Sequence, residues 1–343
     1  VQDAEGNLKV GWSTAEMTSW AIKPIEMLYY SNLESTRIKQ NYKTNGVFVD
    51  VSAAWSPSYL NQITLNADSK TSRSLSQSTA ETIAFFQNLK KIHRSSVSSE
   101  GYESSVDAYS SAYAGFVEAV EREIVGDENA AIMPDYELVC IRPLMANQGM
   151  GYHTRFSEGV VSAKSFDFDR YNTMAIAYGH TGSISNMMND VTDEHYVNTY
   201  YMFQALQSQY LDTSVNVDSI RYFDGREELT LSQAILKKYD FDHSRLHIKY
   251  SNGLELYLNF SDKNWTVTLE GISYTLDKNG YAAANQSIGF VQYSCLKDGN
   301  RVDYVDCADY TYANGRGHST NFGKLTTDKM VILRKDAADT EAL

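Results

Sequence analysis

Residues 47–51 read Val47-Phe48-Val49-Asp50-Val51, an apolar run that a single carboxylate interrupts. A run this continuous is typical of a strand that is buried on both faces, as in a parallel sheet covered by helices. Helical patterns flank the run, because apolar residues recur at helical spacing between Pro24 and Tyr42 and again after residue 78. This alternation predicts parallel β/α units over the first 210 residues.

The same alternation continues down the chain. A capping-box pattern at Ser78-Thr79-Ala80-Glu81 predicts a helix start, and the clearest amphipathic stripe runs from Val106 to Ile124. Further short strands are expected at residues 93–99, 137–144 and 173–178, and a helix capped by Asp190 or Thr192 is expected to run to about Leu211. A closed barrel needs eight strands and typically about 250 residues, and about four repeats are present here. We therefore expect residues 1–215 to form the later half of a (β/α) barrel, or a fold that is not a barrel.

From about residue 220 the pattern changes to short alternating stretches. They include residues 246–250, 254–259, 265–269 and 288–293, and turns such as Asn252-Gly253 and Asp298-Gly299-Asn300 separate them. Alternation of this kind with tight turns predicts an antiparallel meander. We expect residues 216–343 to form a C-terminal β-sandwich.

Composition limits the classes of partner. The net charge of −13 over 343 residues argues against nucleic acid and anionic membranes, which need a basic surface. No run of 18 apolar residues is present, so no transmembrane helix is expected. Cys140, Cys295 and Cys307 lack the spacing of a zinc site, and we expect three free thiols. The first ten residues carry no signal-peptide pattern, and the localisation stays open, with a secreted or cell-surface location favoured over a cytoplasmic one.

Two of the expected strands end in a carboxylate. Asp50 ends the first, and Glu100 lies in Ser98-Ser99-Glu100-Gly101-Tyr102 at the end of the second. Catalytic side chains of parallel β/α folds come from the carboxyl ends of strands, and a carboxylate in an apolar run is costly unless it is paired or functional. Two such groups meet the need of glycosidic cleavage, with one as proton donor and the other as nucleophile or base. The alternatives are a satisfied core aspartate and a surface-loop glutamate.

Polar and aromatic side chains follow the next two expected strands. Such groups suit sugar hydroxyls, and the expected substrate-binding residues are Tyr136, Tyr152, His153, Arg155, Tyr178 and His180. The structural alternatives are an ordinary loop around residue 150 and a histidine that bonds to the backbone. Asp167 and Asp169 are expected on a solvated or hydrogen-bonding face, so no metal or other cofactor is expected.

Three strings carry a resemblance to a known family. They are Gly46-Val47-Phe48-Val49-Asp50-Val51, Ser99-Glu100-Gly101-Tyr102 and Pro134-Asp135-Tyr136-Glu137-Leu138. They resemble the later barrel strands of bacterial glycoside hydrolases in the endo-α-N-acetylgalactosaminidase-like group. Residues 250–259, 265–267 and 278–281 are similar to the β-sandwich that follows such barrels, so the resemblance covers roughly residues 40 to 315.

The resemblance implies a mechanism for this chain. Asp50 would be the nucleophile and Glu100 the acid/base of a retaining enzyme that acts on an α-linked galactose-type sugar, with an oligosaccharide or glycan as substrate. The sequence departs from the family pattern because the early barrel strands are missing. An N-terminal segment or a second chain would then complete the barrel, since a half barrel leaves open strand edges.

Two further function classes stay open. One is a non-catalytic carbohydrate-binding or structural protein that keeps a degenerate barrel scaffold, since a fold does not fix a function. The other is an assembly subunit whose partner covers the open strand edge. The placement of Asp50 and Glu100 separates these classes from an enzyme, because a catalytic pair must lie within about 10 Å in one cleft.

Overall fold

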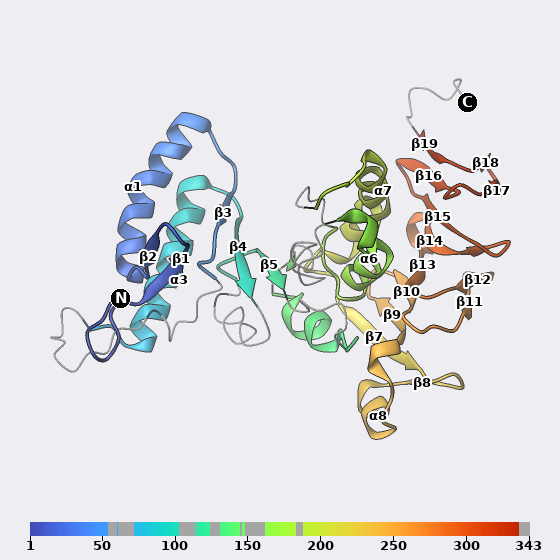
Figure 1. Cartoon of the computed structure of the whole chain (residues 1–343), viewed down its shortest axis with the longest axis horizontal. Coiled ribbons are helices and arrows are strands. Elements are labelled where there is room, and N and C mark those ends of the chain that lie inside the picture. The colour runs from blue at the N-terminus through green and yellow to red at the C-terminus, as the bar shows by residue number, and fades with distance from the viewer. Residues whose placement is uncertain are drawn as a thin grey trace. The chain divides into compact units, whose positions relative to one another are not determined.

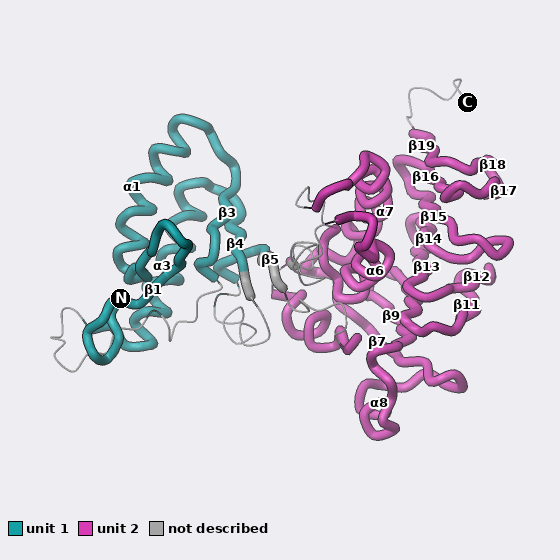
Figure 2. The backbone as a smooth tube through the Cα atoms, viewed as in Figure 1, with its two compact units in different colours: residues 1–124 teal, residues 125–343 magenta. Residues whose placement is uncertain are grey.

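The computed structural model describes residues 1–53, 60, 72–102, 113, 115–123, 131–144, 146–147, 162–182 and 188–335. The chain forms two compact units, residues 1–124 and 125–343 (Figure 2). The expected domain boundary at 215/216 falls inside the second unit, between its second long helix and the first strand of its large sheet. In the described part of the chain, no helix is both long enough and apolar enough to span a membrane.

The first unit is a parallel β/α arrangement preceded by a hairpin (Figure 1). Strands β3, β4 and β5 run parallel in that order, and α1 packs against α3. This arrangement confirms the parallel units expected around residues 47–51. The elements are β1 (Val10–Ser13), β2 (Thr18–Trp20), α1 (Pro24–Tyr42), β3 (Val47–Val49), α3 (Leu75–His93), β4 (Val97–Tyr102) and β5 (Ala119–Glu123).

Local sequence features mark the residues at which both helices of this unit begin. Pro24 stands in the first turn of α1, where its missing N–H costs no helical hydrogen bond. Helix α3 begins at a capping box in which Ser74 and Gln77 exchange hydrogen bonds, so the box expected at Ser78 to Glu81 is one turn too late. Residues 74–77 and 78–81 both begin with serine and end with Gln or Glu, so the sequence alone does not distinguish them. Ser78 cannot act as the cap because it is buried and its hydroxyl donates to the Leu60 carbonyl.

The second unit is dominated by one antiparallel sheet of 11 strands (Figure 1). Its main path runs β19-β16-β15-β14-β13-β10-β9-β7-β8, and the β11–β12 hairpin joins it where Thr275 pairs with Leu296 of β14. The strands are β7 (Val217–Phe223), β8 (Glu228–Leu229), β9 (Arg245–Tyr250), β10 (Glu255–Asn259), β11 (Trp265–Leu269), β12 (Ile272–Leu276), β13 (Gly280–Asn285), β14 (Phe290–Lys297), β15 (Asn300–Asp306), β16 (Tyr310–Asn314) and β19 (Met330–Arg334).

Helices α6 (Phe168–Ala177) and α7 (Asp193–Tyr210) cover one face of this sheet (Figure 1). The Gln292 side chain and the Tyr310 hydroxyl donate to carbonyls of α7, which fixes that helix on the strands. The smaller elements of the unit are η1 (Glu137–Ile141), β6 (Ala146–Asn147), η2 (Ala163–Ser165), α8 (Leu231–Leu236), η3 (Phe241–His243), η4 (Gln286–Ile288), β17 (Thr320–Asn321) and β18 (Thr326–Thr327). The chain is therefore α/β in its first unit and β-rich in its second, and the antiparallel strands and turns expected after residue 220 are confirmed.

Three expected elements are wrong. Residues 173–178 belong to α6 and not to a strand, because Tyr171–Ala177 are buried all round and leave no polar face to mark a helix. Residues 137–141 form a π-helical turn, in which the Arg142 N–H donates to the Glu137 carbonyl. The end of the helix expected through Ile124 is instead β5, because parallel pairing with β4 outweighs the local helical pattern.

Candidate functional site

The two carboxylates expected to carry chemistry lie on neighbouring parallel strands of the first unit, with Asp50 directly after β3 and Glu100 inside β4. Val49 of β3 pairs with Ser99 of β4, so Asp50 and Glu100 follow at the next position of each strand. Neighbouring strands lie about 4.8 Å apart, which brings the two backbones together at this edge of the sheet. Asp50 thus follows the end of β3, as expected, whereas Glu100 precedes the end of β4 at Tyr102 by two residues, because pairing with β5 extends that strand.

The surroundings of the two acids differ. Asp50 is exposed, whereas the side chain of Glu100 is only 4% exposed. One Glu100 oxygen, Oε2, accepts the backbone N–H of Val51 at 3.2 Å. Pairs of carboxyl groups with opposed environments are the arrangement from which enzymes obtain one proton donor and one ionised partner.

Val51 holds the turn after β3 in an uncommon backbone conformation. Its φ of 59° lies in the left-handed region, which costs a β-branched residue of the order of 1–3 kcal/mol. Two hydrogen bonds connect this turn to β4. The Val51 N–H donates to Glu100, and the Ala53 N–H donates to Ser99 Oγ at 3.0 Å. Ser99 Oγ in turn donates to the Val49 carbonyl at 2.6 Å. The turn is thus fixed onto β4 beside Glu100.

Tyr178 and His180 lie in the interior of the second unit. The Tyr178 hydroxyl donates to the Ala131 carbonyl and accepts the Met133 N–H, both at 3.1 Å, and burial raises its pKa to about 12. His180 is 0% exposed, and its Nε2 lies 3.6 Å from Glu137 Oε1. Both side chains therefore contact groups of the chain itself.

The buried Arg142, which the sequence did not mark as a core residue, bonds to several groups of this interior. Arg142 donates to the carbonyls of Tyr210 and Asp212 and lies over the Tyr250 ring at 5.6 Å, and the Tyr210 hydroxyl donates to the His180 carbonyl at 2.7 Å. Gly179 has a φ of 69°, and a Cβ there would come within 2.8 Å of Leu138. The string Tyr178-Gly179-His180 is thus explained by packing.

The other expected sugar-binding residues divide into two groups. Tyr136 is 48% exposed at the start of the π-helical turn. Tyr152, His153 and Arg155 lie outside the described residues.

The acidic pair after residue 166 has structural partners. Asp167 caps α6 by accepting the Arg170 N–H, and Asp169 receives two hydrogen bonds from Arg316, each 2.8 Å long. Arg316 also donates twice to buried Asp303, so it ties α6 to β15. Within the described ranges, no group of three or more His, Cys, Asp or Glu residues is arranged to hold a metal ion. The three cysteines are free thiols, as expected, and Cys295 stands opposite Val302.

A cleft of about 970 Å³ lies at the first turns of α6 and α7. The Phe168 ring stacks on His195 at 4.4 Å, and Asn198 and Asn314 line the same cleft. Its walls come from four separate stretches of sequence, so no motif could have marked it. Comparison with known proteins identifies no relative, since no family model matches the chain and no curated protein matches its sequence.

Proposed function

We propose that this chain is a glycoside hydrolase, or the C-terminal part of one, with Asp50 as nucleophile and Glu100 as acid/base. One observation supports the proposal: Asp50 and Glu100 each follow one residue of the Val49–Ser99 pair on neighbouring parallel strands, with one acid exposed and the other buried. The parallel strands of the first unit would belong to the later half of a barrel that an N-terminal segment or second chain completes. The resemblance of this region favours an α-linked galactose-type substrate.

The resemblance of this region implies a retaining mechanism. Retaining enzymes hold their carboxyl groups about 5–5.5 Å apart, and inverting enzymes hold them about 6.5–9.5 Å apart to admit a water molecule. Asp50 and Glu100 lie on adjacent strands, whose backbones are about 4.8 Å apart, and the proposed retaining mechanism requires their carboxyl groups at the first of these two spacings.

The two steps assign one role to each group. Glu100 gives its proton to the glycosidic oxygen as the bond to the anomeric carbon breaks, and an Asp50 oxygen forms an ester bond to that carbon. Glu100, now ionised, takes a proton from a water molecule whose oxygen attacks the anomeric carbon. The ester bond breaks, Asp50 is released as a carboxylate, and the sugar leaves with its original configuration.

The test uses the whole chain against aryl α- and β-glycosides and natural glycans. Asp50→Asn is expected to abolish turnover of every substrate, because no ester can form. Glu100→Gln is expected to abolish turnover of natural glycans but to retain part of the activity on dinitrophenyl glycosides, whose leaving group needs no proton. Glu26→Gln, an exposed carboxyl on α1, serves as the matched control and is expected to leave turnover unchanged.

Two results would overturn the proposal. One is turnover of natural glycans by Glu100→Gln at the wild-type rate. The other is a folded wild-type chain that hydrolyses none of the panel. Proton NMR of the first product formed distinguishes retention from inversion, and an inverted anomer would remove Asp50 from the nucleophile role.

A further inference from the structure

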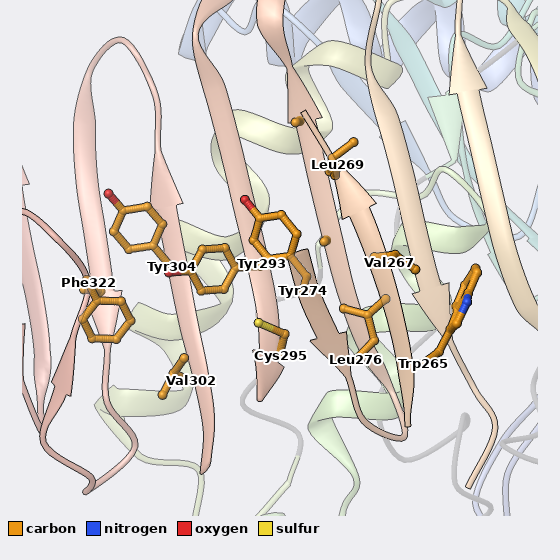
Figure 3. Packing of buried hydrophobic residues seen from close by; sticks show 13 residues of the cluster. Trp265, Val267, Leu269, Tyr274, Leu276, Tyr293, Cys295, Val302, Tyr304 and Phe322 are labelled. Carbon is orange, nitrogen blue, oxygen red and sulfur yellow. The ribbon is translucent and has the colours of Figure 1, made fainter. Parts of the chain in front are cut away.

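A row of aromatic rings crosses the face of the large sheet that α6 and α7 leave uncovered (Figure 3). The row, here called the tyrosine row, consists of Tyr274, Tyr293, Tyr304 and Phe322. Successive ring centroids lie 5.3, 5.2 and 5.6 Å apart, and the last three rings are stacked. The four rings come from β12, β14, β15 and the residue after β17, so sheet pairing brings them together.

Strand register explains why the row forms here. Tyr293 pairs directly with Tyr304, and alanines flank the pair, Ala282 opposite Tyr293 on β13 and Ala313 opposite Tyr304 on β16. Large side chains on the inner strands and small ones on the flanking strands leave room for the rings to stack along the sheet. The rings are 7–8% exposed, so almost all of their carbon surface is buried.

The tyrosines on the two faces of this sheet differ in hydrogen bonding. On the helix side, the hydroxyls of Tyr281, Tyr310 and Tyr312 bond to Gln292, the Tyr201 carbonyl and Asn198, respectively. On the opposite side, the hydroxyls of Tyr274, Tyr293 and Tyr304 have no partner among the residues that the structure describes. Burial raises the pKa of Tyr274 and of Tyr304 to about 12, so both are protonated at neutral pH.

These three residues line a groove of about 380 Å³ whose other walls are partly apolar. None of the three hydroxyl oxygens is among the fully buried, unpartnered atoms of the described residues, so each keeps some contact with solvent. A hydroxyl that bonds to no protein atom takes its hydrogen bonds from a ligand or from water. The groove is thus lined by three tyrosines, whose hydroxyls can each donate and accept, and by the side chains of Ile272, Val291 and Leu296.

One of the two charges at the rim is compensated. Asp306 accepts from Lys324 at 2.8 Å and from Lys335 at 2.6 Å, whereas Lys297 donates to the Asn321 carbonyl and lies 5.6 Å from the centre of the Phe322 ring. A ligand that has hydroxyl groups and an apolar face matches the tyrosine and aliphatic walls of the groove, whose size lies within the roughly 300–1,000 Å³ typical of small-molecule sites.

We propose that the tyrosine-row groove is a binding site for a neutral saccharide. The site lies wholly in the second unit and uses neither Asp50 nor Glu100, so it does not depend on the proposed hydrolase activity. It binds one sugar ring through the three tyrosine hydroxyls, with the apolar walls against the ring's C–H surface.

The test removes the three hydroxyls and keeps the rings. The whole chain is screened on an array of neutral glycans, and the affinity for neutral methyl glycosides and trisaccharides is measured by isothermal titration. The triple variant Tyr274→Phe/Tyr293→Phe/Tyr304→Phe is expected to lose at least tenfold in affinity, with an unfolding midpoint no lower than that of the wild type. Tyr200→Phe, on the solvent-exposed part of α7, is the matched control and is expected to bind like the wild type.

A second variant separates this site from the proposed catalytic one. Asp50→Asn/Glu100→Gln is expected to keep the array binding whether or not the chain is a hydrolase. Binding that is lost in this variant but kept in the triple Phe variant would overturn the groove proposal, because the saccharide would then sit at the first unit. Absence of any saccharide binding at millimolar concentration by the folded wild type would overturn it as well.

Discussion

His247 shows how a single residue of the sheet is held between two carboxylates. Its Nδ1 and Nε2 each lie 2.7 Å from a carboxylate oxygen, that of Glu228 on one side and that of Glu255 on the other. Its ring stacks on Tyr257 with centroids 4.0 Å apart. Burial acts to raise the pKa of Glu255, but hydrogen bonds from His247 and Lys249 outweigh it, so the pKa lies below its usual 4.5.

Glu255→Gln is expected to lower the unfolding midpoint at pH 7. A carboxyl group whose folded pKa is depressed stabilises the fold above its unfolded pKa, and this stabilisation is lost as the pH falls through the folded value. The difference between wild type and variant should therefore be full at pH 7 and should close as the pH falls below about 4.5. Calorimetry from pH 7 to pH 3 measures it.

The control for this prediction is Glu227→Gln. Glu227 is an exposed partner of Lys237, and exposed ion pairs contribute only about 0–1 kcal/mol. Its removal should shift the midpoint little at any pH. A Glu255→Gln deficit that stays constant down to pH 3 would show that the loss is one of packing and not of charge.

At the scale of elements, the hairpin between β14 and β15 depends on two residues with left-handed backbone. Asp298 has a φ of 52° and Gly299 a φ of 81°, which is the pattern of a two-residue turn of type I′. Gly299→Val is expected to destabilise the second unit by about 1–2 kcal/mol, because a β-branched residue is strained in this region. No atom lies within 4 Å of a Cβ at Gly299, so the loss is one of backbone conformation alone.

Urea denaturation measures the effect, and Asp298→Gly is the matched control. Glycine adopts a positive φ at no steric cost, so this variant should unfold close to the wild-type midpoint. Equal midpoints for Gly299→Val and the wild type would contradict the assignment of the turn.

Sequence patterns identified elements best where one face is buried and the other is wet. Strand β11 alternates in this way, and β9 and β10, which are buried at most positions, are bounded by turn residues, so all three were predictable nearly to the residue. Helix α6 was not, because its residues from Tyr171 to Ala177 are all buried and such a run looks the same in a strand and in a helix. Strand β5 depends on pairing with β4, which no local window contains.

The residues of the candidate site also differ in how far the sequence could predict them. Asp50 and Glu100 were predictable as members of successive parallel strands, because helical patterns separate the two stretches, although Glu100 lies inside β4 and not at its end. The tyrosine row and the cleft around Phe168 were not, because their members lie on strands and helices far apart in sequence. A histidine in the sequence does not reveal whether it binds a ligand or packs in the core, as His180 does beside Glu137.

At the scale of the whole molecule, the chain consists of two compact units. The first depends on α1, α3 and three parallel strands, and the second on the large sheet with α6 and α7. Ser74 caps α3 in the first unit, and Arg316 joins α6 to β15 in the second. Because each unit is compact by itself, we expect the units to unfold in two separate thermal transitions.

Variants in each unit assign the two transitions. Ser74→Ala removes a helix cap and should destabilise the first unit by about 1 kcal/mol. Arg316→Gln leaves buried Asp303 without its main partner and should destabilise the second unit by about 3 kcal/mol or more. In differential scanning calorimetry each variant should lower one midpoint and leave the other in place. A single transition that both variants lower would mean that the units unfold as one, and any loss of activity in an Arg316 variant would then reach Asp50 and Glu100 through global stability.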